Sequence, residues 1–148
     1  MTPTIVMTDT PDQQMRRAIV EPLLRFNAQG AGRPVDYRPL ALLLTHPETG
    51  EIIGGLWGGT DFTQLHVDLL FVPDTLRGSG MGRQLMRQAE EEAVRRGCLG
   101  AWLDTFSFQA RGFYERLGYT VFGTIDDFPP GHSRIFMKKW FASSASAS

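Results

Sequence analysis

Apolar residues recur at helical spacing in three stretches of the sequence. This spacing predicts helices over residues 12–29, 80–96 and 108–117. Pro22 predicts a kink in the first helix or its division into two short helices, because proline has no N–H for the helix ladder. The side chains expected on the apolar side of this first helix are Met15, Ile19, Leu23 and Phe26.

The stretch from Gly80 to Arg96 has the strongest helical pattern in the chain. Leu85, Ala89 and Ala93 line one side, and Gly97 follows at the left-handed position that commonly ends a helix. Acidic and basic residues also stand four positions apart, which predicts ion pairs on the exposed side. These predicted pairs are Glu91 with Arg95 and Glu92 with Arg96.

Shorter apolar runs bounded by glycine, proline and polar residues predict strands. The predicted strands cover residues 4–7, 40–44, 51–59, 65–72, 99–105, 119–125 and 134–141. Strands and helices in this order predict a mixed α/β sheet with helices packed against it. We find neither an internal repeat nor a dividing linker, so residues 1–141 are expected to form a single domain. Residues 142–148 are only alanine and serine and are expected to form a disordered tail.

The composition excludes several classes of function. The chain has 148 residues and a formal net charge of −1, which gives no general attraction for nucleic acid or an anionic membrane. No apolar run approaches the roughly 20 residues of a membrane span, and the N-terminus lacks a signal-peptide pattern. Cys98 is the only cysteine, which favours a cytoplasmic protein. The three histidines show no metal-ligand spacing, so no metal site is predicted.

A glycine-rich loop carries the first chemical signal. The segment from Arg77 to Gly82 follows a predicted strand and leads directly into the long helix. Its three glycines allow positive φ angles and a close approach of the backbone to a ligand. A helix N-terminus presents free N–H groups and a partial positive charge, so the loop predicts an anion site suited to a pyrophosphate. Arg77 and Arg83 would add cationic contacts.

Other phosphate-binding motifs do not match this loop. A Walker loop needs Lys and then Ser or Thr after its last glycine, whereas Arg83 and Gln84 follow Gly82 here. The dinucleotide fingerprint needs glycine or alanine where Arg83 or Leu85 stands. The remaining alternative is a glycine-rich turn without a ligand.

Two motifs together resemble the GCN5-related N-acetyltransferase (GNAT) superfamily. The loop Arg77-Gly78-Ser79-Gly80-Met81-Gly82 is similar to the coenzyme A motif of that family. Downstream, Ala110 and the segment from Phe113 to Tyr119 resemble the family's alanine and its aromatic-Tyr-x-x-x-Gly-aromatic run. The chain departs from the family at Ser107, where many members carry an asparagine that contacts the cofactor. The surrounding segment from Asp104 to Ala110 looks like an uncharacterised bacterial subgroup.

The resemblance implies a mostly antiparallel sheet with one splayed pair of parallel strands, and acetyl-CoA as the acyl donor. The pantetheine arm of the cofactor would bind the free strand edge. The residues expected to contact acetyl-CoA are Leu70, Phe71, Val72, Arg77, Gly78, Ser79, Gly80, Met81, Gly82, Arg83, Ser107, Ala110 and Phe113.

The resemblance also implies direct transfer of the acetyl group to an amine. Tyr114 matches the family's general acid, because a phenol is protonated at neutral pH and can donate to a thiolate; alternatively, it is only a core aromatic. The backbone N–H of Phe71 or its neighbour would polarise the thioester oxygen. Asp68 is the first candidate for the general base and His66 the second, and strand alternation places both opposite Leu69 and Phe71. Asp68 is equally well explained as a solvated surface group.

The acceptor side is less well defined. Trp57, His66, Asp104, Asp126 and Asp127 are the residues that could line an acceptor cleft, and the acidic ones would suit a cationic amine. The acceptor is expected to be a small-molecule amine or a protein amino group, and a homodimer is consistent with the family. The alternative function is an acyl-CoA-binding or sensing module without turnover.

Overall fold

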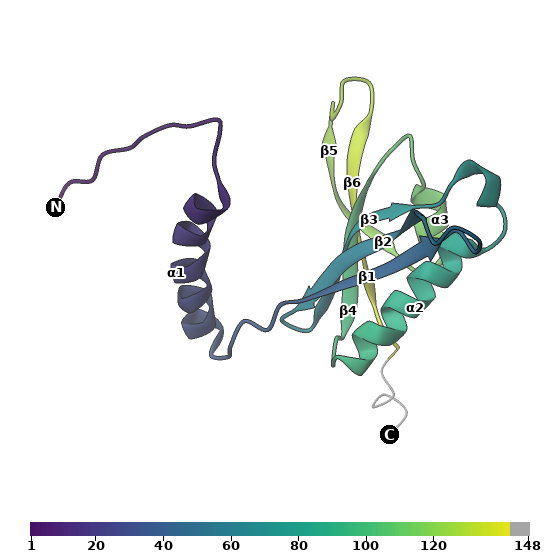
Figure 1. Ribbon diagram of the computed structural model, residues 1–148, viewed down its shortest axis with the longest axis horizontal. Helices are drawn as coiled ribbons and strands as arrows, with labels where there is room; N and C mark the ends of the chain where they lie inside the picture. Colours follow the sequence, from purple (N-terminus) through teal and green to yellow (C-terminus); the bar gives the residue numbers. More distant parts are fainter. Residues whose placement is uncertain (143–148) are drawn as a thin grey trace. The chain divides into compact units, whose positions relative to one another are not determined.

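The computed structural model describes residues 1–142 of the chain (Figure 1). The predicted disordered tail therefore lies outside the described residues, except for Ala142. The internal contacts divide the chain into two units, residues 1–35 and the residues from Asp36 onward, and each is described here by itself.

The first unit contains one helix, α1, which spans Gln13–Ala31. The Asp12 side chain caps its start by accepting a hydrogen bond from the Met15 N–H at 2.8 Å. Gly32 ends it in the left-handed conformation, with φ of 69°. The strand predicted over residues 4–7 is wrong, because these residues form no strand. An isolated four-residue run has no partner strand in this unit to complete its hydrogen bonds.

Pro22 lies inside α1 and does not divide it. Of the two predicted alternatives, a kink or two short helices, the second is therefore wrong. Proline removes one N–H donor from the ladder, but the bonds on both sides of it remain, and both ends of the helix are capped. Five large apolar side chains of α1 are exposed: Met15, Ile19, Leu23, Leu24 and Phe26.

The second unit is built on a six-stranded sheet with strand order β1-β2-β3-β4-β6-β5. All neighbouring strands are antiparallel except β3 and β4, which are parallel. This confirms the predicted mixed α/β class, and the other six predicted strands all form. The strands are β1 (Arg38–Thr45), β2 (Ile52–Asp61), β3 (Gln64–Phe71), β4 (Gly100–Phe106), β5 (Thr120–Asp126) and β6 (Ser133–Trp140).

Two α-helices pack on one face of this sheet. Helix α2 spans Met81–Arg95 and α3 spans Arg111–Arg116, and a short 3-10 helix, η1, covers Asp74–Leu76. Side chains of both α-helices share one core with alternate residues of the central strands, so the two helices cover the same face (Figure 1). The core residues from the helices are Leu85, Met86, Ala89, Ala93 and Tyr114, and those from the strands are Leu56, Leu65, Val67, Ala101, Leu103, Ile135 and Met137.

The charges at the end of α2 pair differently from the prediction. Glu92 pairs with Arg96 at 2.8 Å as expected, but Arg95 also pairs with Glu92, at 3.0 Å, and not with Glu91. Arg96 is not on the exposed side, since only 11% of its side chain is exposed. Its guanidinium donates hydrogen bonds to two backbone carbonyls of β1 and to the Thr60 hydroxyl of β2. Gly97 takes the predicted left-handed conformation, with φ of 87°.

Helix α3 starts three residues later than predicted, at Arg111 rather than Phe108. The cause is the Gln109 side chain. Its Oε1 accepts hydrogen bonds from the Phe106 N–H at 2.8 Å and from the Thr105 hydroxyl at 3.0 Å. These bonds hold the residues after β4 in a turn and delay the first helical turn.

The parallel strands β3 and β4 separate toward their carboxyl ends. Gln64–Val67 pair with Gly100–Leu103, but β3 continues to Phe71 and β4 to Phe106 without further pairing between them. The sheet therefore contains the splayed parallel pair that the family resemblance implied. The open end of the pair lies beside the glycine-rich loop, because that loop follows β3 in the chain.

A bulge in β3 changes which side chains share a face. Val67 pairs with Gly58 and Leu69 pairs with Trp57, so Asp68 is an extra residue without a partner in β2. The bulge shifts the alternation, and Leu69 and Phe71 lie on the same face as His66. The prediction that strand alternation puts His66 opposite Leu69 and Phe71 is therefore wrong.

Candidate active site

The glycine-rich loop forms an open turn between η1 and α2. Gly78 and Gly80 have positive φ angles of 80° and 84°, which other residues adopt only with strain. A Cβ atom added at either position would meet no atom within 4 Å. The space over these two glycines is therefore open, as a site for a ligand group requires.

The start of α2 presents backbone donors to this open space. The first helical bond runs from the Gln84 N–H to the Gly80 carbonyl at 3.0 Å, so the N–H groups of Met81, Gly82 and Arg83 precede the helix ladder. No side chain of the described residues caps this end, and its first turn contains no acidic residue. The arrangement can bind an anion through three N–H groups and the positive end of the helix.

Arg77 and Ser79 hold the loop in this shape. The Arg77 guanidinium pairs with Asp74 at 2.6 Å and donates from Nε to the Val72 carbonyl at 3.4 Å. The Ser79 hydroxyl donates to the Leu76 carbonyl. Arg77 is still largely exposed, so its guanidinium remains able to contact an anion over the loop. Arg83, in the first turn of α2, is the second cation at this end of the helix.

Gly82 has a different role from the other two glycines. It has a helical conformation, and a Cβ there would lie 3.3 Å from Cζ of Phe113 and 3.8 Å from Cγ2 of Val72. Its missing side chain makes room for protein rather than for a ligand. This contact joins the start of α2 to α3 and to the end of β3, so the loop and α3 form one local structure.

Tyr114 lies beneath this structure, in the core. The Tyr114 N–H bonds to the Ala110 carbonyl at 3.2 Å, and the ring packs edge-on against Phe113 and Tyr119. Burial raises the pKa of the Tyr114 phenol to about 12, and the charge of Asp104 contributes a smaller increase. The phenol is therefore protonated at neutral pH and able to donate a proton.

Asp104 is already paired with a cation. Arg134 of β6 donates from Nε to Oδ1 of Asp104 at 2.8 Å, and its Nη2 lies 2.7 Å from the same oxygen. A carboxylate in such a pair attracts an incoming ammonium less than a free one does. The predicted role of Asp104 in drawing in a cationic acceptor is weakened by this geometry. Arg134 was not among the predicted residues, and its alternation with the buried Ile135 and Met137 was the only signal in the sequence.

Ser107 connects the turn after β4 to the start of β6. Its hydroxyl oxygen accepts a hydrogen bond from the Ser133 N–H at 2.9 Å, and its own N–H donates to the Ser133 carbonyl at 2.8 Å. The Ser107 hydroxyl proton is still free to donate to a ligand. Ser107 therefore fixes the turn after β4 to the first residue of β6.

The residues of β3 divide between core and surface. Leu70 is partly buried against the core, whereas Asp68 at the bulge and Phe71 at the strand end are exposed. The His66 ring stacks on Trp102 with ring centroids 3.9 Å apart, and its Nε2 is buried without a hydrogen-bond partner among the described residues. Trp57 is exposed and lies opposite Leu69 in the sheet. His66, Trp57 and Trp102 therefore belong to the face opposite α2.

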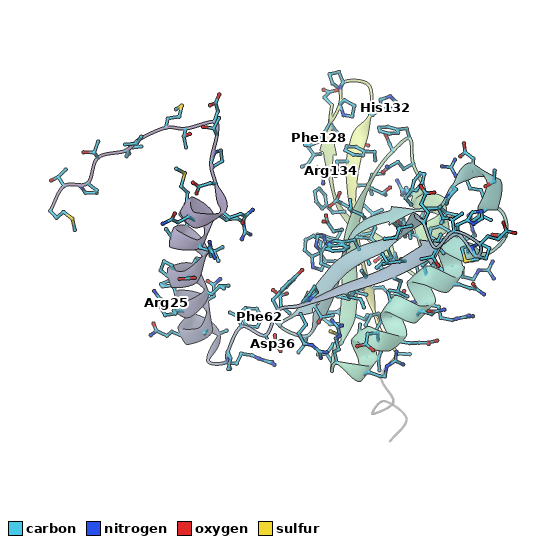
Figure 2. All side chains as sticks on the ribbon, viewed as in Figure 1. Arg25, Asp36, Phe62, Phe128, His132 and Arg134 are labelled. Carbon is cyan, nitrogen blue, oxygen red and sulfur yellow. The ribbon has the colours of Figure 1, made fainter. Side chains whose placement is uncertain are left out.

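Asp126 and Asp127 lie where β5 ends and the connection to β6 begins. Both are exposed, and Asp127 has a positive φ of 55°. The connection closes through a hydrogen bond from the Phe128 N–H to the His132 carbonyl at 3.2 Å. Figure 2 shows Phe128, His132 and Arg134 near one another at this end of the sheet. The structure thus brings the connection close to the Asp104–Arg134 pair.

Several other predictions concern groups outside this region. Cys98 is buried in the core, and burial raises the pKa of its thiol, which disfavours a reactive thiolate. Within residues 1–142, no cluster of three or more histidine, cysteine, aspartate or glutamate side chains is arranged to hold a metal ion. No helix in the same residues is long and apolar enough to span a membrane.

Comparison with known proteins identifies the family. The model of the acetyltransferase (GNAT) family matches residues 13–119. Acetyltransferase Atu2258 of Agrobacterium fabrum is 38% identical over 136 residues, which cover 92% of this chain and 98% of that protein. Blasticidin-S acetyltransferase of Streptomyces morookaense is 44% identical over 100 residues, which cover 66% of this chain and 74% of that protein.

Solved structures agree with this assignment. A crystal structure from Agrobacterium tumefaciens has a TM-score of 0.86 at 37% identity and covers 93% of this chain and 99% of its own. An aminoglycoside 6'-N-acetyltransferase solved with coenzyme A shares the fold, with a TM-score of 0.61 at 17% identity, covering 92% of this chain and 96% of its own. The family model and the 38% identical relative show that the chain belongs to the acetyltransferase (GNAT) family.

Proposed function

We propose that this protein is an acetyl-CoA-dependent N-acetyltransferase that transfers an acetyl group to a primary amine. One observation carries the proposal: the N-terminus of α2 is open and uncapped behind two positive-φ glycines, beside the open end of the β3–β4 pair. A pyrophosphate fits this place, because three backbone N–H groups can donate to it and no acidic residue in the first turn opposes it.

The cofactor would bind along the elements that meet at the glycine-rich loop, which are α2, β3 and α3. The pyrophosphate would lie on the N–H groups of residues 81–83, with Arg77 and Arg83 as the nearest cations. The pantetheine arm would run along the free edge of β3 at Leu70, Phe71 and Val72, toward the gap between the two strands. Phe113, Ala110 and Ser107 would border the arm on the side of α3 and the turn before it.

Acetyl-CoA supplies an activated acyl group, and the protein supplies position and proton transfer. The amine nitrogen attacks the thioester carbonyl carbon, and the C–S bond breaks as the new C–N bond forms. The Phe71 N–H or its neighbour would donate to the carbonyl oxygen as negative charge develops there. Tyr114, which is protonated at neutral pH, would give its proton to the departing sulfur. Holding both reactants in place can lower the barrier by ~7–11 kcal/mol.

The amine must also lose a proton, and two groups are candidates for accepting it. Asp68 is exposed at the bulge of β3, where a carboxylate can reach solvent and a bound amine. The Nε2 of His66 is buried and lacks a partner among the described residues, so His66 is less accessible to the amine. We therefore assign the role of base to Asp68, directly or through a water molecule.

We propose a small-molecule amine as the acceptor. The support is the 44% identity to an acetyltransferase whose substrate, blasticidin S, is a small molecule. Asp126 and Asp127 are exposed acids that would attract a cationic amine, and exposed Trp57 would offer an apolar contact. Asp104 would contribute less, because Arg134 already balances its charge.

Free-thiol release from acetyl-CoA tests this function. The purified protein would be incubated with acetyl-CoA and, in turn, blasticidin S, spermidine, single amino acids and a peptide with a free N-terminus. The expected result is amine-dependent thiol release well above the rate with acetyl-CoA alone. Binding of acetyl-CoA in calorimetry without turnover of any amine would instead support a non-catalytic acyl-CoA-binding module. Absence of both binding and turnover would contradict the proposed site.

A further inference from the structure

Arg134 occupies a cage made by three phenylalanine rings and one carboxylate. Its guanidinium carbon lies 5.3 Å from the centre of the Phe106 ring, 5.2 Å from that of Phe128 and 5.9 Å from that of Phe136. Its N–H groups bond to Asp104. Aromatic faces and an acidic counter-ion are the surroundings that bind a guanidinium best, so this side chain has one well-defined position.

The four partners of Arg134 come from β4, from β6 itself and from the connection between β5 and β6. Phe106 ends β4 and lies directly opposite Arg134 in the sheet, and Asp104 lies opposite Phe136. Phe128 belongs to the connection between β5 and β6, and its ring also lies 5.8 Å from the ring of Phe106. Arg134 therefore joins the connection between β5 and β6 to the carboxyl end of β4, the strand that forms one side of the splayed pair (Figure 2).

The Asp104–Arg134 pair also lies near Tyr114, because the charge of Asp104 contributes to the raised pKa of the Tyr114 phenol. Without Arg134, the charge of Asp104 would be partly buried and unbalanced, since only 20% of its side chain is exposed. Such a group costs stability and changes the electrostatic surroundings of the proposed acid. Arg134 therefore affects both the shape and the charge of one wall of the candidate site.

We propose that Arg134 is a positioning residue for acetyl transfer, which balances Asp104 and fixes the β5–β6 connection through Phe128 against the end of β4. This inference rests on the proposed function. Arg134 does not touch the reacting atoms; it acts through Asp104 and Phe128. Its effect is expected on the acceptor side, because Phe128 belongs to the same connection as Asp126 and Asp127, the proposed acceptor residues.

Paired variants separate this role from simple stabilisation. Arg134→Met removes the cation, and Asp104→Asn with Arg134→Met also removes the carboxylate charge that the first variant leaves unbalanced. Lys138→Met is the matched control, because Lys138 stands on the same strand and face, 5.8 Å from the Phe122 ring, and pairs with no acid among residues 1–142. Arg134→Lys keeps the positive charge but lacks the planar guanidinium group, which stacks on aromatic rings and donates several hydrogen bonds in one plane.

The kinetic measurement uses acetyl-CoA and the amine of the panel that is turned over fastest. Arg134→Met should lower kcat/KM at least tenfold, with acetyl-CoA affinity within twofold of the parent, and should lower Tm. The double variant should recover most of the lost Tm but not the lost kcat/KM, and Arg134→Lys should recover part of both. If kcat/KM returns together with Tm in the double variant, Arg134 is only structural and the proposal is overturned.

Amide hydrogen exchange provides a readout that does not depend on turnover. The Ser133 N–H bonds to the Ser107 hydroxyl and the Phe128 N–H to the His132 carbonyl, so both report on the connection. Their exchange should accelerate at least tenfold in the double variant and stay unchanged in Lys138→Met. If the parent turns over no amine, the proposed function fails, and this exchange result still decides whether Arg134 fixes the connection. Unchanged exchange in the double variant overturns the inference.

Discussion

Phe113 of α3 packs directly against Gly82 of α2, so that a Cβ on Gly82 would lie 3.3 Å from Cζ of the ring. The contact joins the two motifs that identify the family, although they are separated in sequence by most of α2 and by β4. The three glycines of the loop therefore have two different roles. Gly78 and Gly80 leave open space and take positive φ angles, whereas Gly82 makes room for a side chain.

Gly80→Asp should abolish binding of acetyl-CoA. A side chain at Gly80 enters open space over the helix N-terminus, where a carboxylate would take the place of the pyrophosphate. Gly80→Asn is the matched control, because asparagine has nearly the same shape and also tolerates a positive φ angle. Calorimetry should show a much larger loss for aspartate than for asparagine. Equal affinity in Gly80→Asp and the parent would place the phosphates elsewhere.

Tyr114→Phe should keep the fold and the affinity for acetyl-CoA but lower kcat by ~10²–10⁴-fold, the usual effect of losing a general acid. The change removes one hydroxyl and leaves the ring contacts with Phe113 and Tyr119 in place. Steady-state kinetics with the fastest amine would measure it, after a single-turnover experiment shows that chemistry limits the rate. An unchanged kcat under those conditions would leave Tyr114 as a core aromatic.

Stability should decrease in alkaline solution partly through Tyr114. Its pKa in the folded protein is about 12, above the ordinary value near 10, because burial disfavours the phenolate. As the pH rises past about 10, the unfolded chain loses this proton first, so the stabilising contribution is complete below that pH and is lost on the way to about 12. Urea unfolding at pH 9 and pH 11 should show a smaller loss of stability in Tyr114→Phe than in the parent.

Tyr119 sets the control for this comparison. Burial, and then the neighbouring Glu90, also raise the pKa of Tyr119, so its contribution persists in Tyr114→Phe. The variant with both tyrosines changed to phenylalanine should therefore lose less stability between the two pH values than either single variant. The same pH dependence in all four proteins would rule out these phenols as its source.

Arg96→Met should destabilise the second unit by about 1.5–3 kcal/mol, the range for hydrogen bonds made by a charged group. Arg96 donates to the Thr60 hydroxyl and to the carbonyls of Arg38 and Pro39, all at 3.2 Å. It thereby fixes the end of α2 to β1 and β2. Denaturant unfolding measures the change.

Arg95→Met is the matched control for that variant. Arg95 is the next residue back along α2 and pairs with the same Glu92, but its side chain is exposed. An exposed ion pair contributes about 0–1 kcal/mol, so this variant should unfold close to the parent. Similar losses in both variants would show that the pairing with Glu92, and not the bonds to β1 and β2, explains the effect.

Asp126→Asn with Asp127→Asn should raise the KM for a cationic amine and leave acetyl-CoA affinity unchanged. The two carboxylates are exposed and would attract an ammonium through solvent, so the effect should shrink as salt is added. Asparagine suits the positive φ of 55° at Asp127, so the backbone of the connection should persist. An unchanged KM at low salt would place the acceptor site away from this connection.

The sequence by itself determined the features that depend on neighbours in the chain. Local spacing explains the α2 pattern and the succession of the six strands along the chain. Conformational preference explains the left-handed Gly97 and the positive φ angles of Gly78 and Gly80. The two motifs also indicated the family without any knowledge of the structure. These predictions hold because periodicity and glycine conformation act over only a few residues.

Where local rules failed, a nearby side chain or a missing partner was the reason. Gln109 bonds back to Thr105 and Phe106 and delays α3, and Pro22 interrupts one bond of α1 without dividing the helix. The residues from Thr4 to Met7 have strand-forming character but form no strand in their unit. Propensity states what a segment can form, but the available hydrogen-bond partners decide what it does form.

Only the tertiary structure decided how the walls of the candidate site are built. The bulge at Asp68 depends on the register with β2, and it moves Leu69 and Phe71 to the face of His66. The pair between Asp104 and Arg134 joins residues 30 positions apart in the sequence, and Arg96 reaches Thr60 across 36 positions. Register and long-range ion pairs arise when distant segments meet in space, and no local pattern in the sequence records which segments will meet.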